Sequence, residues 1–189
     1  MGKLLALSAE DRSIILDLKG NGILEDVVPH RIQAPDGFMA FLCSDCDHIR
    51  DKFEFLCKVC SAQANLERVH LFACHSGGML LSPKSPTRKG NEHELFKLHI
   101  ADAMLPSVKG LSLLISKCHA PCGAAYLQGL NFYDVLRHTF LGKIFVKEGL
   151  PGLRVAVFAQ IYDEIDGRRK TYAVHGEKWW KHVEQKNIF

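Results

Sequence analysis

Short, continuously apolar runs alternate with longer segments of helical pattern along this chain, and this alternation limits the folds that are open to it. Continuous apolar runs bounded by polar segments are typical of strands that are buried on both faces. The runs that we predict as buried strands are 38–42, 69–73, 111–115 and 155–162. The segments that we predict as helices between them are 48–65, 92–105 and 131–139. Strands that alternate with helices predict an α/β fold, with a mostly parallel central β-sheet flanked by helices.

The two ends of the chain add further predicted elements to this core. Ser8 is a suitable N-cap for a first helix, and Asp166-Gly167 is a hairpin-type turn that leads into a last strand. The predicted elements at the ends are a helix at 9–18, a loop over most of 20–36, a strand at 171–174 and a helix at 177–186.

A chain of 189 residues falls within the usual size of one domain. We therefore expect a single domain over 1–189. Its expected parts are an N-terminal helix and arm over 1–35, an α/β core over 36–175 and a C-terminal helix over 176–189.

The charge and hydropathy of the chain exclude several classes of partner. Lys and Arg total 24 and Asp and Glu total 21, which gives a formal net charge of +3. So small an excess does not predict a nucleic-acid-binding protein. No apolar run approaches the roughly 18 residues of a membrane helix, and the first apolar stretch is too short for a secretory signal. We expect a cytoplasmic protein whose partners are neither nucleic acids nor membranes.

Seven cysteines and ten histidines are the unusual feature of the composition. The cysteines are Cys43, Cys46, Cys57, Cys60, Cys74, Cys118 and Cys122. Because their number is odd and no secretion signal is visible, metal binding or thiol chemistry is a better expectation than a disulfide framework.

Ligands of parallel α/β sheets bind at the carboxyl ends of strands, so the residues that follow each predicted strand are candidates for a site. The first three strands are followed by Cys43-Ser44-Asp45-Cys46, by His75-Ser76-Gly77-Gly78 and by Cys118-His119-Ala120-Pro121-Cys122-Gly123.

Two interpretations of the cysteines use only the first half of the chain. Cys43 and Cys46 with Cys57 and Cys60 have the spacing of a four-thiolate zinc site. The second pair, however, lies in a helical pattern in which the two cysteines share a face at i and i+3. Alternatively, Cys43 and Cys46 follow a strand at a predicted helix start, which is the arrangement of a thiol redox pair.

A third interpretation joins the ends of two strands. Cys43 ends the first strand, while His119 and Cys122 follow the third strand as His-x-x-Cys-Gly. Two thiolates and one imidazole balance the charge of Zn²⁺ and leave the fourth tetrahedral position open, as a catalytic zinc site requires.

At these residues the sequence resembles the β-class carbonic anhydrases. That family carries Cys-x-Asp-x-Arg after one strand and His-x-x-Cys-Gly after a later one, which match Cys43-Ser44-Asp45 and His119-Ala120-Pro121-Cys122-Gly123. The turn His75-Ser76-Gly77-Gly78 resembles the glycine-containing turn of the family. The resemblance covers roughly 36–175.

The resemblance implies an enzyme, a lyase that reversibly hydrates carbon dioxide to bicarbonate through zinc-bound hydroxide. It implies Zn²⁺ on Cys43, His119 and Cys122, and Asp45 as the catalytic residue that orients the water or carries its proton. It also implies substrate contacts from Ser76, Gly77 and Gly78, and a homodimer or higher homo-oligomer.

One position departs from the family pattern. Asp47 stands where the family has the Arg that pairs with the motif aspartate. Without that partner Asp45 could become the fourth zinc ligand and close the site, unless Arg50, about one helical turn further, replaces the missing Arg. Two other functions therefore stay open: a zinc-binding relative without carbonic anhydrase activity, and a thiol redox protein that uses Cys43 and Cys46.

Overall fold

The computed structural model describes residues 5–34, 36–44, 49–61, 68–163 and 168–188. Its centre is a six-stranded sheet with the order β1-β6-β5-β4-β2-β3. The strands are β1 (Leu24–Asp26), β2 (Phe38–Cys43), β3 (Val69–Cys74), β4 (Leu113–Ala120), β5 (Arg154–Asp163) and β6 (Arg168–Val174). The four neighbouring strands β3, β2, β4 and β5 run parallel, whereas β6 and β1 are added antiparallel at one edge. The predicted α/β fold with a mostly parallel sheet is confirmed.

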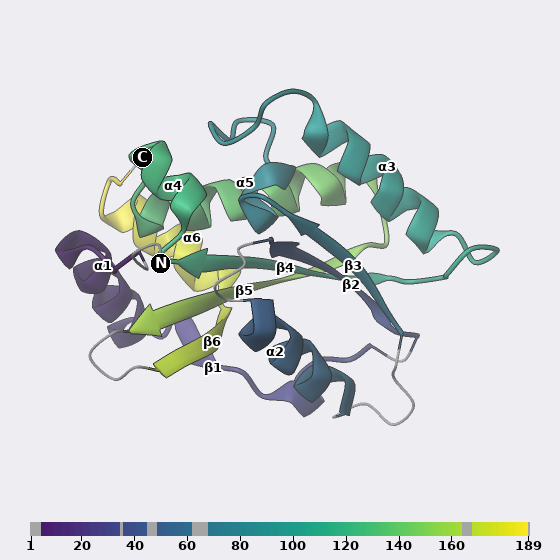
Figure 1. Cartoon of the computed structure of the whole chain (residues 1–189), viewed down its shortest axis with the longest axis horizontal. Helices are drawn as coiled ribbons and strands as arrows, with labels where there is room; N and C mark the ends of the chain where they lie inside the picture. The colour runs from purple at the N-terminus through teal and green to yellow at the C-terminus, as the bar shows by residue number, and fades with distance from the viewer. Residues whose placement is uncertain (1–4, 35, 45–48, 62–67, 164–167, 189) are drawn as a thin grey trace.

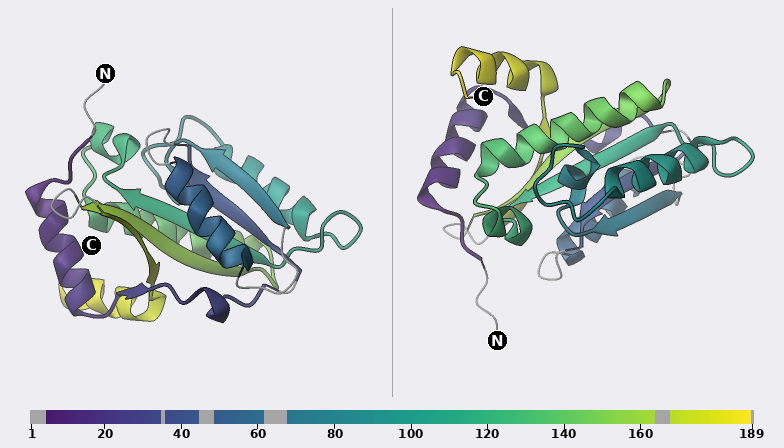
Figure 2. Two further views of the ribbon diagram at one scale, coloured as in Figure 1. Left: turned by 60° about the horizontal axis from the view of Figure 1, so that its bottom comes forward. Right: turned by 90° about the horizontal axis from the view of Figure 1, so that it is seen from above.

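Helices cover both faces of this sheet (Figures 1 and 2). They are α1 (Ala9–Gly20), α2 (Ile49–Ser61), α3 (Glu92–Met104), α4 (Gly123–Leu127), α5 (Phe132–Gly149) and α6 (Gly176–Gln185). Two short 3₁₀ segments, η1 (Pro29–Arg31) and η3 (Gly77–Leu81), complete the described elements.

The apolar side chains of the strands divide between the two faces. On one face, Phe55 and Val59 of α2 pack against β2 and β4. On the opposite face, Ile100 of α3 and Val146 of α5 pack against the same strands. Because both faces are covered, every residue of β2 and β4 is buried, which explains their continuous apolar runs.

The structure changes the predicted boundaries most in three places. The stretch 20–36, predicted mainly as loop, contains β1 and η1, and β1 pairs with β6 at the edge of the sheet. Helix α5 continues ten residues past the predicted end at 139, to Gly149. Strand β4 begins at Leu113 and runs to Ala120, well beyond the predicted end at 115.

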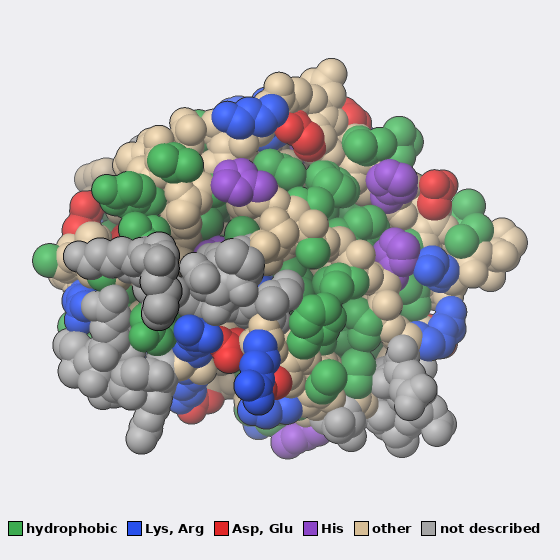
Figure 3. Space-filling view, in the orientation of Figure 1, with side chains coloured by type: hydrophobic (Ala, Val, Ile, Leu, Met, Phe, Trp, Pro, Cys, Tyr) green, Lys and Arg blue, Asp and Glu red, His purple; other side chains and the backbone are tan. Residues whose placement is uncertain are grey.

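The surface of the molecule carries charges of both signs. On the face drawn in Figure 3, Lys and Arg side chains are scattered among acidic and hydrophobic ones. Among the described helices, none combines the length and the apolar character that crossing a membrane requires.

Candidate metal centre

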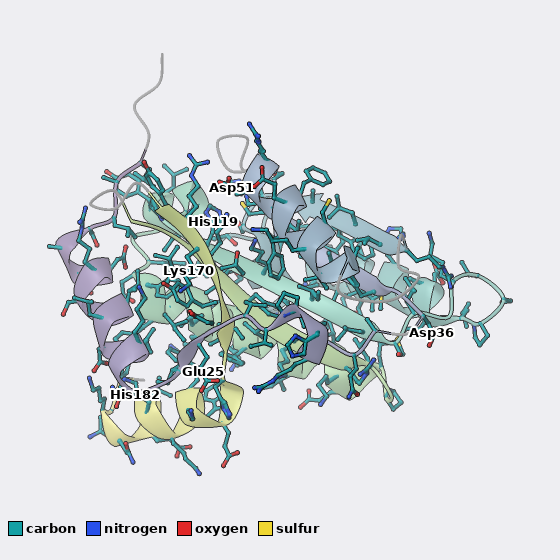
Figure 4. The ribbon with its side chains drawn as sticks, turned by 90° about the horizontal axis from the view of Figure 1, so that it is seen from below. Glu25, Asp36, Asp51, His119, Lys170 and His182 are labelled. Atoms are coloured by element: carbon teal, nitrogen blue, oxygen red, sulfur yellow. The ribbon has the colours of Figure 1, made fainter. Side chains whose placement is uncertain are left out.

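The side chains of Cys43, His119 and Cys122 converge at the carboxyl end of the sheet. Their possible ligand atoms all lie within 4.8 Å of one another, and all three residues are buried. Cys43 is the last residue of β2, His119 is the last but one of β4, and Cys122 is the N-cap of α4. Figure 4 shows His119 on the sheet at the end nearest the first turn of α2, where Asp51 lies.

The sheet topology explains this convergence. Strands β2 and β4 are parallel neighbours, and Phe41 is in register with Ser116. Cys43 therefore lies two residues beyond a register pair and His119 three residues beyond it, so both reach the same edge of the sheet. The prediction that His119 follows the third strand is wrong in detail, because the strand continues through it. Its position at the carboxyl end of the sheet is nevertheless the expected one.

The two candidate sulfur ligands are hydrogen-bonded to each other. A hydrogen bond from Cys122 lowers the pKa of Cys43, against the opposing effect of burial, and His119 and the charge of Lys52 lower it further. The hydrogen bond to Cys43 and burial both raise the pKa of Cys122. The thiol of Cys43 is accordingly the more acidic of the two.

This donor set fits a zinc ion. Zinc binds cysteine sulfur at about 2.3 Å and histidine nitrogen at about 2.0–2.1 Å, so the ligand atoms of one ion lie about 4 Å or less apart in a tetrahedral site. The possible ligand atoms of the cluster come from two sulfurs and one imidazole and lie within 4.8 Å of one another. They would have to move only slightly closer together to bind one ion. The buried Cys43, His119 and Cys122 group could therefore hold a metal ion.

A cleft of about 340 Å³ leads to this cluster. His119 and Cys122 line it, together with residues of the N-terminal segment, among them Ala6 and Asp11, and of α4, among them Tyr126. The carboxylate of Asp11 also accepts a hydrogen bond of 2.7 Å from the backbone N–H of Phe132 at the start of α5. The cleft gives a small molecule a path to two of the three candidate ligands.

Several predicted site residues do not reach this cluster or fall beyond what is described. Asp45, Cys46 and Asp47 lie outside the described residues. Arg50 points to solvent with its side chain 88% exposed, and its Nε donates a 3.0 Å hydrogen bond to Glu54. Among the described residues, the Arg50 side chain thus pairs with Glu54 at the surface.

The predicted substrate contacts Ser76, Gly77 and Gly78 lie beside the cluster, at the start of η3. A Cβ atom on Gly77 would lie 2.6 Å from the backbone nitrogen of Cys43 and 2.8 Å from the carbonyl oxygen of Lys117, so only glycine allows this close approach. Ser76 has a positive φ of 71°, and its buried hydroxyl has no hydrogen-bond partner among the described residues. None of the three lines the cleft at His119 and Cys122.

Of the other described cysteines, Cys74 lies in register with Cys43 on the neighbouring strand β3, and the rest lie on α2 and β4. Cys57 and Cys60 lie on the helix α2, as predicted, with Cys57 exposed and Cys60 half-buried. Cys118 lies on β4, where burial raises the pKa of its thiol to about 12. Within the described ranges, Cys43, His119 and Cys122 form the group of histidine, cysteine and acidic residues that could share a metal.

Three buried polar residues around the cluster were not predicted from the sequence: Lys52, Lys117 and Gln160. The Nζ of Lys52 donates a 2.8 Å hydrogen bond to the carbonyl oxygen of Cys43. The Nζ of Lys117 has no hydrogen-bond partner among the described residues and lies 4.5 Å from the centre of the Phe55 ring. A lysine within a central strand and a glutamine within the apolar run 155–162 were the available signals.

No protein-family model and no curated protein matches the sequence. Among solved structures, the chain is similar to one described as the β-carbonic anhydrase CcaA, at 10% sequence identity and a TM-score of 0.36. The match covers 87% of this chain and 83% of that chain.

Proposed function

We propose that this protein is a zinc-dependent enzyme of the carbonic anhydrase type, which reversibly hydrates carbon dioxide to bicarbonate. The observation that carries the proposal is the buried group of Cys43, His119 and Cys122 at the end of an open cleft. A catalytic zinc needs three protein ligands and one open position, and this donor set supplies three.

In this proposal, the residues of the metal centre have distinct roles in binding the ion and in positioning its ligands. Cys43 and Cys122 as thiolates and His119 as a neutral imidazole hold the ion, and Cys122 gives up its proton on binding. Bound zinc would supply Lewis acidity, which lowers the pKa of coordinated water toward about 7. Lys52 fixes the backbone of Cys43, so that one ligand is held before the ion arrives.

The remaining roles are part of the proposal as expectations from the sequence. Asp45 would orient the attacking water or accept its proton. Ser76, with a buried hydroxyl beside the cluster, would contact the substrate, and Gly77 and Gly78 would contribute backbone N–H groups. We further propose a homodimer or higher homo-oligomer, and a cytoplasmic location.

A second candidate function is zinc binding without hydration activity. It is favoured by the position of Arg50, which pairs with Glu54 at the surface, while Asp47 stands at the motif position. If neither residue places a guanidinium beside Asp45, the carboxylate of Asp45 would be free to occupy the fourth position on the zinc.

Stopped-flow measurement of carbon dioxide hydration, on protein of verified zinc content from about pH 7 to 9, tests the proposal. We expect activity that rises with pH, that is lost in His119→Ala together with the zinc, and that remains in His99→Ala. His99 is a suitable control because it is an exposed histidine on α3. One zinc per chain without activity at any pH would support the second candidate, and protein that binds no zinc would contradict both.

A further inference from the structure

Gln160 carries a buried polar atom that the proposed metal centre does not yet use. It lies in β5, directly in register with His119 of β4. Both side chains are buried, at 4% and 3% exposure, and both line the same narrow void with Tyr162 and Arg169. The Oε1 atom of Gln160 has no hydrogen-bond partner among the described residues.

The burial of the Gln160 Oε1 atom without a described hydrogen-bond partner requires an explanation. A buried polar group without a partner costs about 1–3 kcal/mol, and most such groups in folded proteins are satisfied. Arg169, which also lines the void, directs its Nη1 to Asp51 at 2.6 Å and its guanidinium carbon lies 5.0 Å from the centre of the Tyr162 ring. The imidazole of His119, on the adjacent strand, is a donor that faces the same void.

The spacing of the strands agrees with such a contact. Neighbouring strands lie about 4.8 Å apart, so two side chains on register partners that face the same void can hydrogen-bond. A metal-ligating histidine commonly donates its second ring N–H to a carbonyl or carboxylate, which fixes the tautomer and the orientation of the ring.

We propose that Gln160 is a positioning residue of the metal centre: its Oε1 accepts a hydrogen bond from the ring nitrogen of His119 that does not bind the metal. This inference rests on the proposed zinc site. The neutral amide holds the imidazole in the tautomer that presents a lone pair to the ion, and it adds no charge to a centre that two thiolates already neutralise.

Zinc affinity, measured by competition with a chromophoric chelator, tests the inference on the whole protein. Gln160→Met removes the acceptor at similar size, and we expect zinc binding about 10–100-fold weaker, as for other residues of this kind. Gln160→Glu keeps an acceptor, and we expect affinity close to that of the wild type. Ser116→Ala is the control, because it removes a different buried polar group without a partner among the described residues, a hydroxyl on β4, and should leave zinc affinity unchanged.

A second readout separates positioning from a general effect on folding. In the zinc-bound wild type, nuclear magnetic resonance should show a slowly exchanging ring N–H of His119, which should exchange rapidly in Gln160→Met and slowly in Gln160→Glu. Unchanged affinity and exchange in Gln160→Met, with zinc lost in His119→Ala, would overturn the inference and leave the zinc site standing. Full zinc binding by His119→Ala would instead contradict the zinc site itself.

Discussion

Lys52 on α2 donates a hydrogen bond of 2.8 Å from its Nζ to the carbonyl oxygen of Cys43, the last residue of β2. Only 1% of the lysine is exposed, so the bond is shielded from water. The helix that covers one face of the sheet thereby fixes the backbone of a candidate metal ligand. The ammonium group also favours the thiolate form of Cys43, whose pKa is lowered chiefly by hydrogen bonding to Cys122.

Lys52→Met should destabilise the protein, because the carbonyl oxygen of Cys43 loses a charged donor in a buried place. Loss of such a hydrogen bond costs about 1.5–3 kcal/mol. Urea denaturation at pH 7 measures the change in the free energy of unfolding. Weaker zinc binding should accompany it. A variant as stable as the wild type would show that the bond contributes nothing.

Lys117→Met should change the free energy of unfolding in the opposite direction, which makes it the matched control for Lys52→Met. Lys117 is as buried as Lys52, but its Nζ lacks a hydrogen-bond partner among the described residues. Burial, with a smaller effect of Lys52, lowers the pKa of Lys117 to about 7. An apolar side chain removes the cost of burying the charge, so we expect a gain of at least about 1 kcal/mol in the free energy of unfolding.

The gain from Lys117→Met should depend on pH. Since the pKa of this amine is lower in the folded than in the unfolded protein, the cost in the wild type is full below about pH 7 and falls as the pH rises above it. The difference in stability between variant and wild type should therefore shrink from pH 7 to pH 10. A difference that grows over this range would contradict the assignment.

Asp17 should contribute stability that is lost in acid. Its Oδ2 accepts hydrogen bonds from Tyr133 at 2.7 Å, His182 at 2.8 Å and Lys186 at 2.7 Å, which join α1 to α5 and to the C-terminal segment. Although burial opposes it, hydrogen bonding to Lys186 and Tyr133 and the charge of His182 lower the pKa of Asp17.

Asp17→Asn should therefore lower the free energy of unfolding by about 1–3 kcal/mol at pH 7. Because the folded-state pKa of the carboxyl is depressed, its contribution is complete above about pH 4 and is lost as the pH falls through the folded value. Urea denaturation from pH 7 to pH 3 should show the two proteins converging in acid. A constant difference over the whole range would rule out an electrostatic origin.

Gly77→Ala should disrupt the candidate metal centre. The added Cβ would meet the Cys43 backbone nitrogen at 2.6 Å, and the φ of Gly77 is +53°. Gly152→Ala is the control, because Gly152 has a φ of +90° but open space around its Cα. Both variants carry the strain of a positive φ, about 1–2 kcal/mol, whereas only Gly77→Ala should weaken zinc binding. Equal zinc affinity in the two would contradict the close packing at Cys43.

The sequence pattern predicted the sheet well because burial on both faces produces continuous apolar runs. It failed where buried polar residues interrupt such a run: Ser116 and Lys117 ended the predicted third strand at 115, although β4 continues to Ala120. The helix predicted at 131–139 ends too early. In the second half of α5, only a narrow stripe of buried residues indicates a helix.

The candidate ligands could be predicted because cysteine and histidine lie near the carboxyl ends of strands that are neighbours in the sheet. The residues around these ligands could not be predicted. The contacts of Lys52 and Gln160 depend on which helix and which strand lie beside the ligands in the folded protein. Spacing along the chain also left the four-thiolate alternative with Cys57 and Cys60 open. Only the sheet order brings Cys122, from a segment 79 positions further than Cys43, next to it.

Zinc K-edge X-ray absorption of the purified protein tests the central claim most directly. A centre built from Cys43, His119 and Cys122 predicts two sulfur neighbours at about 2.3 Å and nitrogen or oxygen neighbours at about 2.0–2.1 Å. Four sulfur neighbours would instead place the ion on Cys43, Cys46, Cys57 and Cys60. That result, or the absence of bound zinc, would contradict this account.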